Sequence, residues 1–99
     1  MEWEGDVLEI SPTADLNPLL EAIYDDIPAP RVANRAILGE IEKLTAVQKQ
    51  RLIRRYGLDG NQPKAIGVIA RESKRSRTAV ELSLSRSLHR LRMFVIKMA

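Results

Sequence analysis

Apolar residues recur along most of the chain at the three- and four-residue intervals that are typical of amphipathic helices. The clearest series lies near the C-terminal end, with intervals of 4, 4, 3, 4 and 3 residues through Val80, Leu84, Leu88, Leu91, Val95 and Met98. No stretch alternates strictly between apolar and polar residues, as a half-buried strand does. The pattern therefore predicts an all-α fold, a small helical domain that ends in a long C-terminal helix.

Capping and turn residues divide this pattern into five helices. The expected ranges are a short helix from residue 18 that ends before residue 27, then 31–43, 46–56, 64–72 and 77–98. Ser, Thr and Asn favour the N-cap and proline favours the first turn, so the expected starts are marked by Asn17-Pro18, Thr45, Pro63 and Ser76. Gly57 is expected in the left-handed conformation that ends a helix.

Length and composition exclude several classes of protein. The chain has 99 residues, one histidine and no cysteine, so we expect one small domain without disulfides or a zinc site. It contains no glycine-rich phosphate loop and no serine or cysteine beside a plausible base, so we expect neither an enzyme nor a cofactor. The chain lacks a long apolar run and a secretory leader, which predicts a cytoplasmic protein with no membrane partner.

Charge is distributed unevenly along the chain. Residues 1–30 hold eight acidic residues and no Lys or Arg, whereas residues 31–99 hold all 16 Lys and Arg and five acids. The sequence thus predicts an acidic N-terminal arm, with a short helix and a linker at Pro28-Ala29-Pro30, followed by a basic domain over 31–99. Three roles remain open for the arm. It screens the basic surface, its apolar residues are part of the fold, or it contacts a partner protein.

Basic residues gather where the pattern of apolar positions suits a helix-turn-helix, over about 64–92. Between residues 49 and 77 there are nine Lys and Arg and only two acids. In a helix-turn-helix, the second helix enters the major groove and its first residues reach the bases. The candidate DNA-binding residues on the expected outer side are Lys64, Arg71, Lys74, Arg75, Ser76, Arg77, Thr78 and Glu81.

The stretch from about residue 44 to residue 92 resembles region 4 of bacterial RNA polymerase sigma factors. Three pieces carry the resemblance. They are Leu44-Thr45 with Leu52 and Arg55-Tyr56-Gly57-Leu58-Asp59-Gly60; Ile66, Ile69 and Ala70; and Ser76-Arg77 with Val80 and Ser87-Leu88-His89-Arg90-Leu91-Arg92. Against the family pattern, Lys74 and Arg75 replace a glycine and a valine in the turn. Glu81 and Leu82 replace the arginine and glutamine that face the promoter.

The resemblance implies a transcription regulator that binds RNA polymerase, through its β flap or through region 4 of the sigma-containing holoenzyme. It would redirect or restrain transcription for a bacteriophage or as a bacterial accessory factor. The apolar groove that the family uses for the flap maps here to Leu52, Tyr56, Leu58 and Phe94. The alternative is a stand-alone helix-turn-helix regulator that binds DNA, and a third is an assembly protein with a borrowed helix-turn-helix.

The end of the chain raises a separate question. Residues 93–96 are apolar on nearly every side of the expected helix. Such a surface is normally covered. Three covers remain open: residues 16–27, a second copy that forms a homodimer through the C-terminal helix, or a partner protein.

Overall fold

The computed structural model describes residues 7–28 and 30–98. Within these residues it contains five helices and no strand, which confirms the all-α prediction. In chain order they are α1 (Asn17–Ile23), α2 (Asn34–Ile41), α3 (Ala46–Tyr56), α4 (Ile66–Ser73) and α5 (Arg77–Met98). The molecule measures 38 × 28 × 22 Å along its principal axes. No helix in the described ranges is long and apolar enough to cross a membrane.

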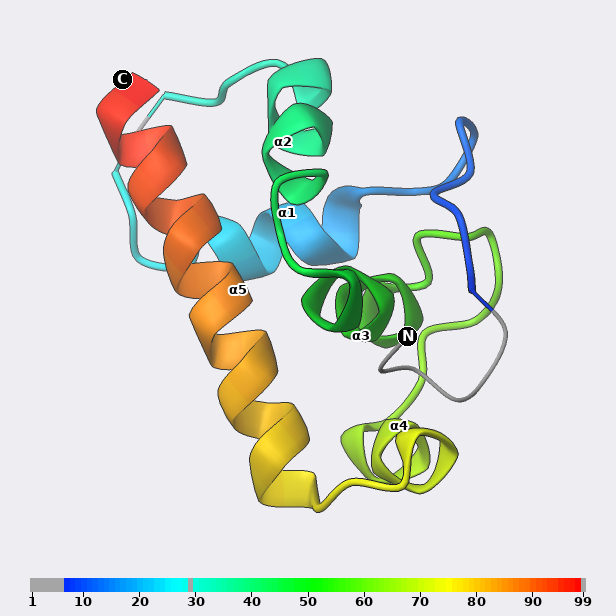
Figure 1. Cartoon of the computed structure of the whole chain (residues 1–99). Coiled ribbons are helices and arrows are strands. Elements are labelled where there is room, and N and C mark those ends of the chain that lie inside the picture. Colours follow the sequence, from blue (N-terminus) through cyan, green and yellow to red (C-terminus); the bar gives the residue numbers. More distant parts are fainter. Residues whose placement is uncertain (1–6, 29, 99) are drawn as a thin grey trace.

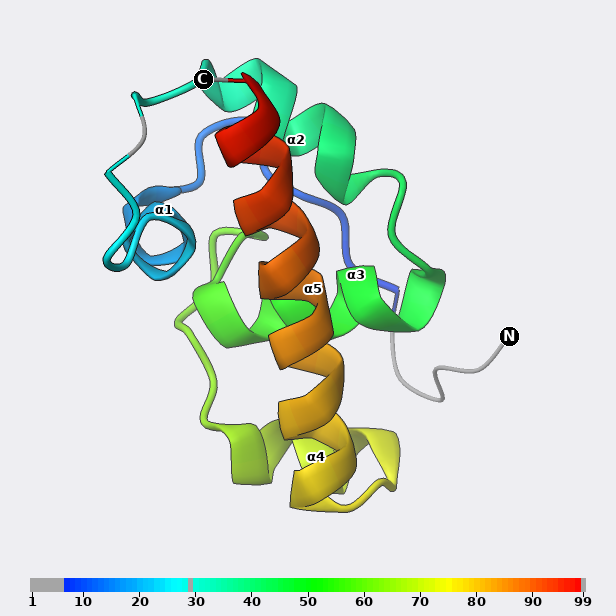
Figure 2. The same cartoon turned by 90° about the vertical axis from the view of Figure 1, so that its left-hand side faces the viewer.

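The long helix α5 runs from one end of the molecule to the other, and the four shorter helices pack along one side of it (Figure 1). α4 lies against the first turns of α5, α3 against its middle, and α1 and α2 towards its C-terminal end, as both views show (Figure 2). At 1.5 Å per residue, the 22 residues of α5 span about 33 Å. One end of α5 therefore adjoins the basic turn at residues 74–76, and the other end lies beside α1 in the acidic N-terminal part of the chain.

Local signals fix both ends of α3, whose predicted bounds are confirmed. The Thr45 hydroxyl accepts a hydrogen bond from the Gln48 N–H at 3.2 Å, and the Gln48 side chain accepts one from the Thr45 N–H, which completes a capping box. Gly57 ends the helix in the left-handed conformation, at φ 65°. A Cβ atom on Gly57 would lie 2.5 Å from the backbone oxygen of Asn61, so only glycine fits there.

The predicted start of the second helix is wrong, because a tertiary contact holds residues 31–33 out of the helix. The N–H of Val32 donates to the hydroxyl of buried Tyr24 at 2.9 Å, and the guanidinium of Arg31 lies 4.2 Å from the centre of the same ring. Ala33 is extended, and α2 starts only at Asn34.

Two other starts also differ from the predicted ones. Pro63 does not open α4, because the N–H of Lys64 donates to the carbonyl of Arg54 at 2.9 Å and Ala65 is extended. Asn17 is not an N-cap but the first helical residue of α1; its N–H donates to Asp15 Oδ1 at 3.0 Å. In both places a backbone N–H is bonded outside the helix.

All five helices contribute to one hydrophobic core, which continues across the predicted boundary at residue 30. The largest fully buried apolar side chains are Leu19, Ile23, Ile37, Ile41, Leu52, Ile53, Leu58, Ile69, Val80, Leu91 and Val95. Burying an aliphatic side chain of this size stabilises the fold by about 1.5–3 kcal/mol. Leu19 and Ile23 belong to the acidic arm, so α1 is part of the fold and covers part of the C-terminal half of α5.

Polar contacts hold the described part of the arm on the other helices. The backbone N–H and C=O of Leu8 pair with the Gln50 side chain, at 2.8 Å each, and the N–H of Ser11 donates to the carbonyl of Leu58 at 2.8 Å. Arg92 donates twice to the carbonyl of Ala22 in α1, at 3.2 and 2.8 Å. Ala29 of the predicted linker lies outside the described residues.

Candidate nucleic-acid interface

A three-residue turn, 74–76, joins α4 to α5. The N–H of Arg75 donates to the carbonyl of Ala70 at 2.9 Å, and the N–H of Lys74 donates to that of Arg71 at 3.3 Å. These two bonds form a Schellman motif, the common end of a helix whose last residue is left-handed. Lys74 takes that conformation, with φ 55° and ψ 43°, although it is not a glycine. The glycine-to-lysine change noted in the sequence therefore leaves an ordered turn in place.

The start of α5 is fixed by Ser76, as predicted. Its hydroxyl accepts a hydrogen bond from the Ala79 N–H at 3.1 Å, and its carbonyl accepts one from the Val80 N–H at 3.2 Å. Behind the turn, α4 packs against α5, and Ile69, Val80 and Leu84 are buried in the core. The opposite side of the first turns of α5 faces away from α4 (Figure 1).

A buried serine lies in the same interface. Ser73, the last residue of α4, is 4% exposed, and its hydroxyl donates to the carbonyl of Ile69 at 2.8 Å. A buried hydroxyl without a partner would be costly, but this one is bonded within its own helix. The serine is therefore compatible with a packed position.

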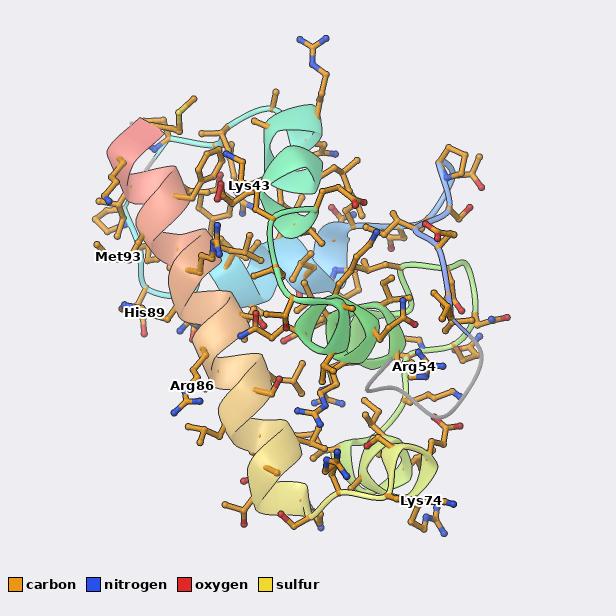
Figure 3. The ribbon with its side chains drawn as sticks, viewed as in Figure 1. Lys43, Arg54, Lys74, Arg86, His89 and Met93 are labelled. Carbon is orange, nitrogen blue, oxygen red and sulfur yellow. The ribbon has the colours of Figure 1, made fainter. Side chains whose placement is uncertain are left out.

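Four of the candidate DNA-binding residues are exposed cations around this turn: Arg71, Lys74, Arg75 and Arg77. We call these four the basic rim. Thr78 and Glu81 are exposed beside it on α5, and Glu81 Oε1 lies 4.0 Å from Arg77 Nε. The structure brings these residues together at one end of the molecule, where Figure 3 shows Lys74 at the turn.

Lys64 differs from the other candidates because it is engaged with a carboxylate. Its Nζ lies 2.6 Å from Oε2 of Glu72, whose Oε1 lies 3.7 Å from Nε of buried Arg54. The backbone carbonyl of Lys64 accepts a hydrogen bond from the Arg55 guanidinium at 3.1 Å. These contacts tie the start of α4 to α3, so Lys64 has a structural role and is not part of the basic rim.

The residues expected to form an apolar groove for a protein partner do not form one. Leu52 and Leu58 are 0% exposed and belong to the core to which all five helices contribute. Tyr56 and Phe94 are half-buried at its edge. Burial raises the pKa of Tyr56, an effect that the charges of Arg55 and Arg92 partly oppose.

The outer face of α5 exposes Met93 and Ile96, from the apolar stretch that the sequence analysis singled out, and Leu82, which it did not place among the candidate site residues. Figure 3 shows Arg86, His89 and Met93 on the side of α5 that points away from the other helices. The signal for this face was available: residues 82, 86, 89, 93 and 96 repeat at helical spacing, out of phase with the buried series.

No family model, curated protein or solved structure matches this chain. The resemblance to sigma factor region 4 thus rests on the motifs given above and on no independent match. Among the described residues, no group of three or more His, Asp or Glu side chains is placed to hold a metal ion.

Proposed function

We propose that this protein is a transcription regulator that binds duplex DNA through a helix-turn-helix made of α4, residues 74–76 and the first turns of α5. The observation that carries this proposal is the basic rim, four exposed cations around one ordered turn at the start of α5. The major groove of DNA is wide enough for a helix. Lys, Arg and helix N-termini bind the phosphates on either side of it.

Within this complex the residues of the rim have different partners. Arg71, Lys74 and Arg75 lie at the end of α4 and in the turn, where they bind phosphates and set the position of α5. Arg77 and Glu81 are on the first two turns of α5. An arginine there binds a phosphate and, at a matching sequence, guanine O6 and N7, whereas a glutamate accepts a hydrogen bond from cytosine N4.

Fluorescence anisotropy with a labelled duplex tests the proposal. Arg86, further along α5, is a fifth exposed cation beside the four of the basic rim, and five phosphate contacts give a log–log salt slope of about −4.5. We expect the double variant Lys74→Ala/Arg77→Ala to lose about ten-fold in affinity at low salt, with the slope reduced by about 1.8.

The matched control is Arg35→Ala/Lys97→Ala, which removes two exposed positive charges from the other end of the molecule. It should keep most of the affinity, and circular dichroism should show both double variants folded. Equal losses in the two double variants would mean that net charge alone drives binding. A wild-type protein that does not bind duplex DNA at low salt would refute the proposal.

A second candidate function is the binding of RNA polymerase that the resemblance implies. The observation in its favour is the apolar end of α5, where Met93, Ile96 and Met98 are exposed. It lies at the far end of α5 from the basic rim, so one molecule has room for both contacts (Figure 1). Nuclease-treated bacterial lysate discriminates between the two. In a pull-down from this lysate, the wild-type protein should retain polymerase core, and the variant Met93→Asp/Ile96→Asp should not. If the wild type retains no polymerase after nuclease treatment, only DNA binding remains as the function.

A further inference from the structure

Leu82 is exposed in the middle of a polar surface. It is 48% exposed, and it is the only large exposed apolar side chain among the described residues of α4, the turn and the first half of α5. The other large exposed apolar residues lie at Val7 and at the C-terminal end of α5. Around Leu82 on α5 stand Thr78, Glu81 and Arg86, all exposed.

The helix places Leu82 on the side that faces away from the core. Val80 and Leu84 on either side of it are buried, so Leu82, two residues from each, points to the opposite face. Thr78 and Arg86 lie one turn before and one turn after it on that face. Figure 3 shows Arg86, on this face, pointing away from the other described helices.

We propose that Leu82 recognises the C5 methyl group of thymine in the major groove, an inference that rests on the proposed function. Of the groups that unmodified base pairs present there, this methyl is the apolar one, and the others are hydrogen-bond donors and acceptors. Leucine can make no hydrogen bond, so the thymine methyl is the group that it can select. The rim cations beside it supply the attraction to phosphate that brings the two together.

The neighbours of Leu82 extend this selectivity. The Thr78 side chain carries a methyl group of its own one turn earlier on the same face. Glu81 lies next to Leu82 and can accept from cytosine N4 but repels phosphate. The arrangement predicts a preference for a thymine beside a base pair that offers a donor to Glu81.

Deoxyuridine gives a direct test, because it differs from thymidine only in lacking this methyl group. The preferred site is first selected from a pool of random duplexes with the full chain. Each thymine of that site is then replaced singly by deoxyuridine. We expect one replacement to weaken wild-type binding about four-fold, the factor for losing one buried methyl group.

Leu82→Ala should bind the thymine duplex more weakly and should bind the thymine and deoxyuridine duplexes equally at that position. Met93→Ala is the matched control, since it removes an exposed apolar side chain from the same face of α5, far from the turn. It should keep the full sensitivity to deoxyuridine. The thymine and deoxyuridine duplexes carry the same charge, so the salt dependence of binding should be the same for both.

Three results overturn the inference while leaving DNA binding intact: no preferred sequence is selected, no deoxyuridine replacement weakens wild-type binding, or Leu82→Ala remains sensitive. If no deoxyuridine replacement weakens wild-type binding and Leu82→Ala binds DNA as well as the wild type, Leu82 would be assigned to a protein partner instead. Absence of any duplex binding by the wild type would refute the proposed function itself.

Discussion

At the scale of single residues, Lys74 shows a conflict between stability and binding. A residue with a Cβ atom in the left-handed conformation costs about 1–2 kcal/mol relative to its usual conformations. Lys74 is held there by the Schellman bonds that end α4, at φ 55°. Glycine would adopt this conformation without strain. A lysine at such a position is explained if its charge contributes to binding, because strain of this kind collects at functional sites.

Replacing Lys74 by glycine should therefore separate the two properties. We expect Lys74→Gly to raise the free energy of unfolding by about 0.5–1 kcal/mol, because relief of strain exceeds the greater flexibility of the unfolded chain. For a chain of this size that is a rise in Tm of roughly 3–6 °C. The same variant should bind duplex DNA about two- to five-fold more weakly, with the salt slope reduced by about 0.9.

Two further variants at this position serve as controls. Lys74→Ala removes the charge but keeps Cβ, so it should match Lys74→Gly in DNA affinity without the gain in Tm. Lys74→Arg keeps both the charge and the Cβ atom, and it should resemble the wild type in both measurements. If Lys74→Gly bound DNA as well as the wild type, the lysine would have no part in binding.

At the scale of helices, the ends are set by glycines and caps in some places and by distant contacts in others. Gly57 ends α3 and leaves no room for a Cβ atom. Gly39 lies within α2, exposed, and a Cβ atom there would meet nothing within 4 Å. The same substitution should thus have opposite effects at the two positions.

Gly39→Ala should stabilise the protein by about 0.5–1 kcal/mol, because alanine restricts the unfolded chain and favours a helix. Gly57→Ala should destabilise it by about 2 kcal/mol or more, since it adds left-handed strain to a 2.5 Å contact with Asn61. Thermal unfolding followed by circular dichroism measures both. A Tm at or above the wild-type value for Gly57→Ala would mean that the turn after α3 differs from the one described.

Which helix ends were predictable depends on where their hydrogen bonds go. The capping box of Thr45 and the left-handed Gly57 use neighbours in sequence, so both ends of α3 could be read from the sequence. The start of α2 could not, because it depends on Val32 bonding to Tyr24, eight residues earlier and across a loop. Sequence periodicity carries no information about such a contact.

The candidate site divides in the same way. Exposure of the basic rim follows from helical phase and from the caps at Lys74 and Ser76, which are local. Burial of Leu52 and Leu58 depends on the packing of all five helices into one core, and the N-terminal segment is bonded to Gln50 and Leu58 from more than 40 positions away in sequence. The apolar groove was therefore expected where the chain instead covers itself.

At the scale of the whole molecule, the acidic residues around the end of α1 lie far along α5 from the basic rim. Five acids fall within the described part of the arm, Glu9, Asp15, Glu21, Asp25 and Asp26, and residues 7–28 contain no Lys or Arg. The C-terminal end of α1 is bonded to Arg92, which lies 15 positions, or about 22 Å, along α5 from Arg77. The described arm is thus held away from the basic rim by its packing.

This separation predicts that these acids hardly screen the DNA-binding surface. At 0.15 M salt the Debye length is about 8 Å, much less than the distance from α1 to the rim. The triple variant Glu21→Gln/Asp25→Asn/Asp26→Asn, all at exposed positions around the end of α1, should change affinity for duplex DNA less than two-fold. By contrast, Glu81→Gln removes one negative charge 4.0 Å from Arg77 and should tighten binding to duplexes of arbitrary sequence by more than the triple variant does. Anisotropy titrations at 0.15 M salt compare the two. Tighter binding by the triple variant than by Glu81→Gln would show that the arm reaches the rim in solution, and that its attachment to α3 and α5 opens often enough to compete with DNA.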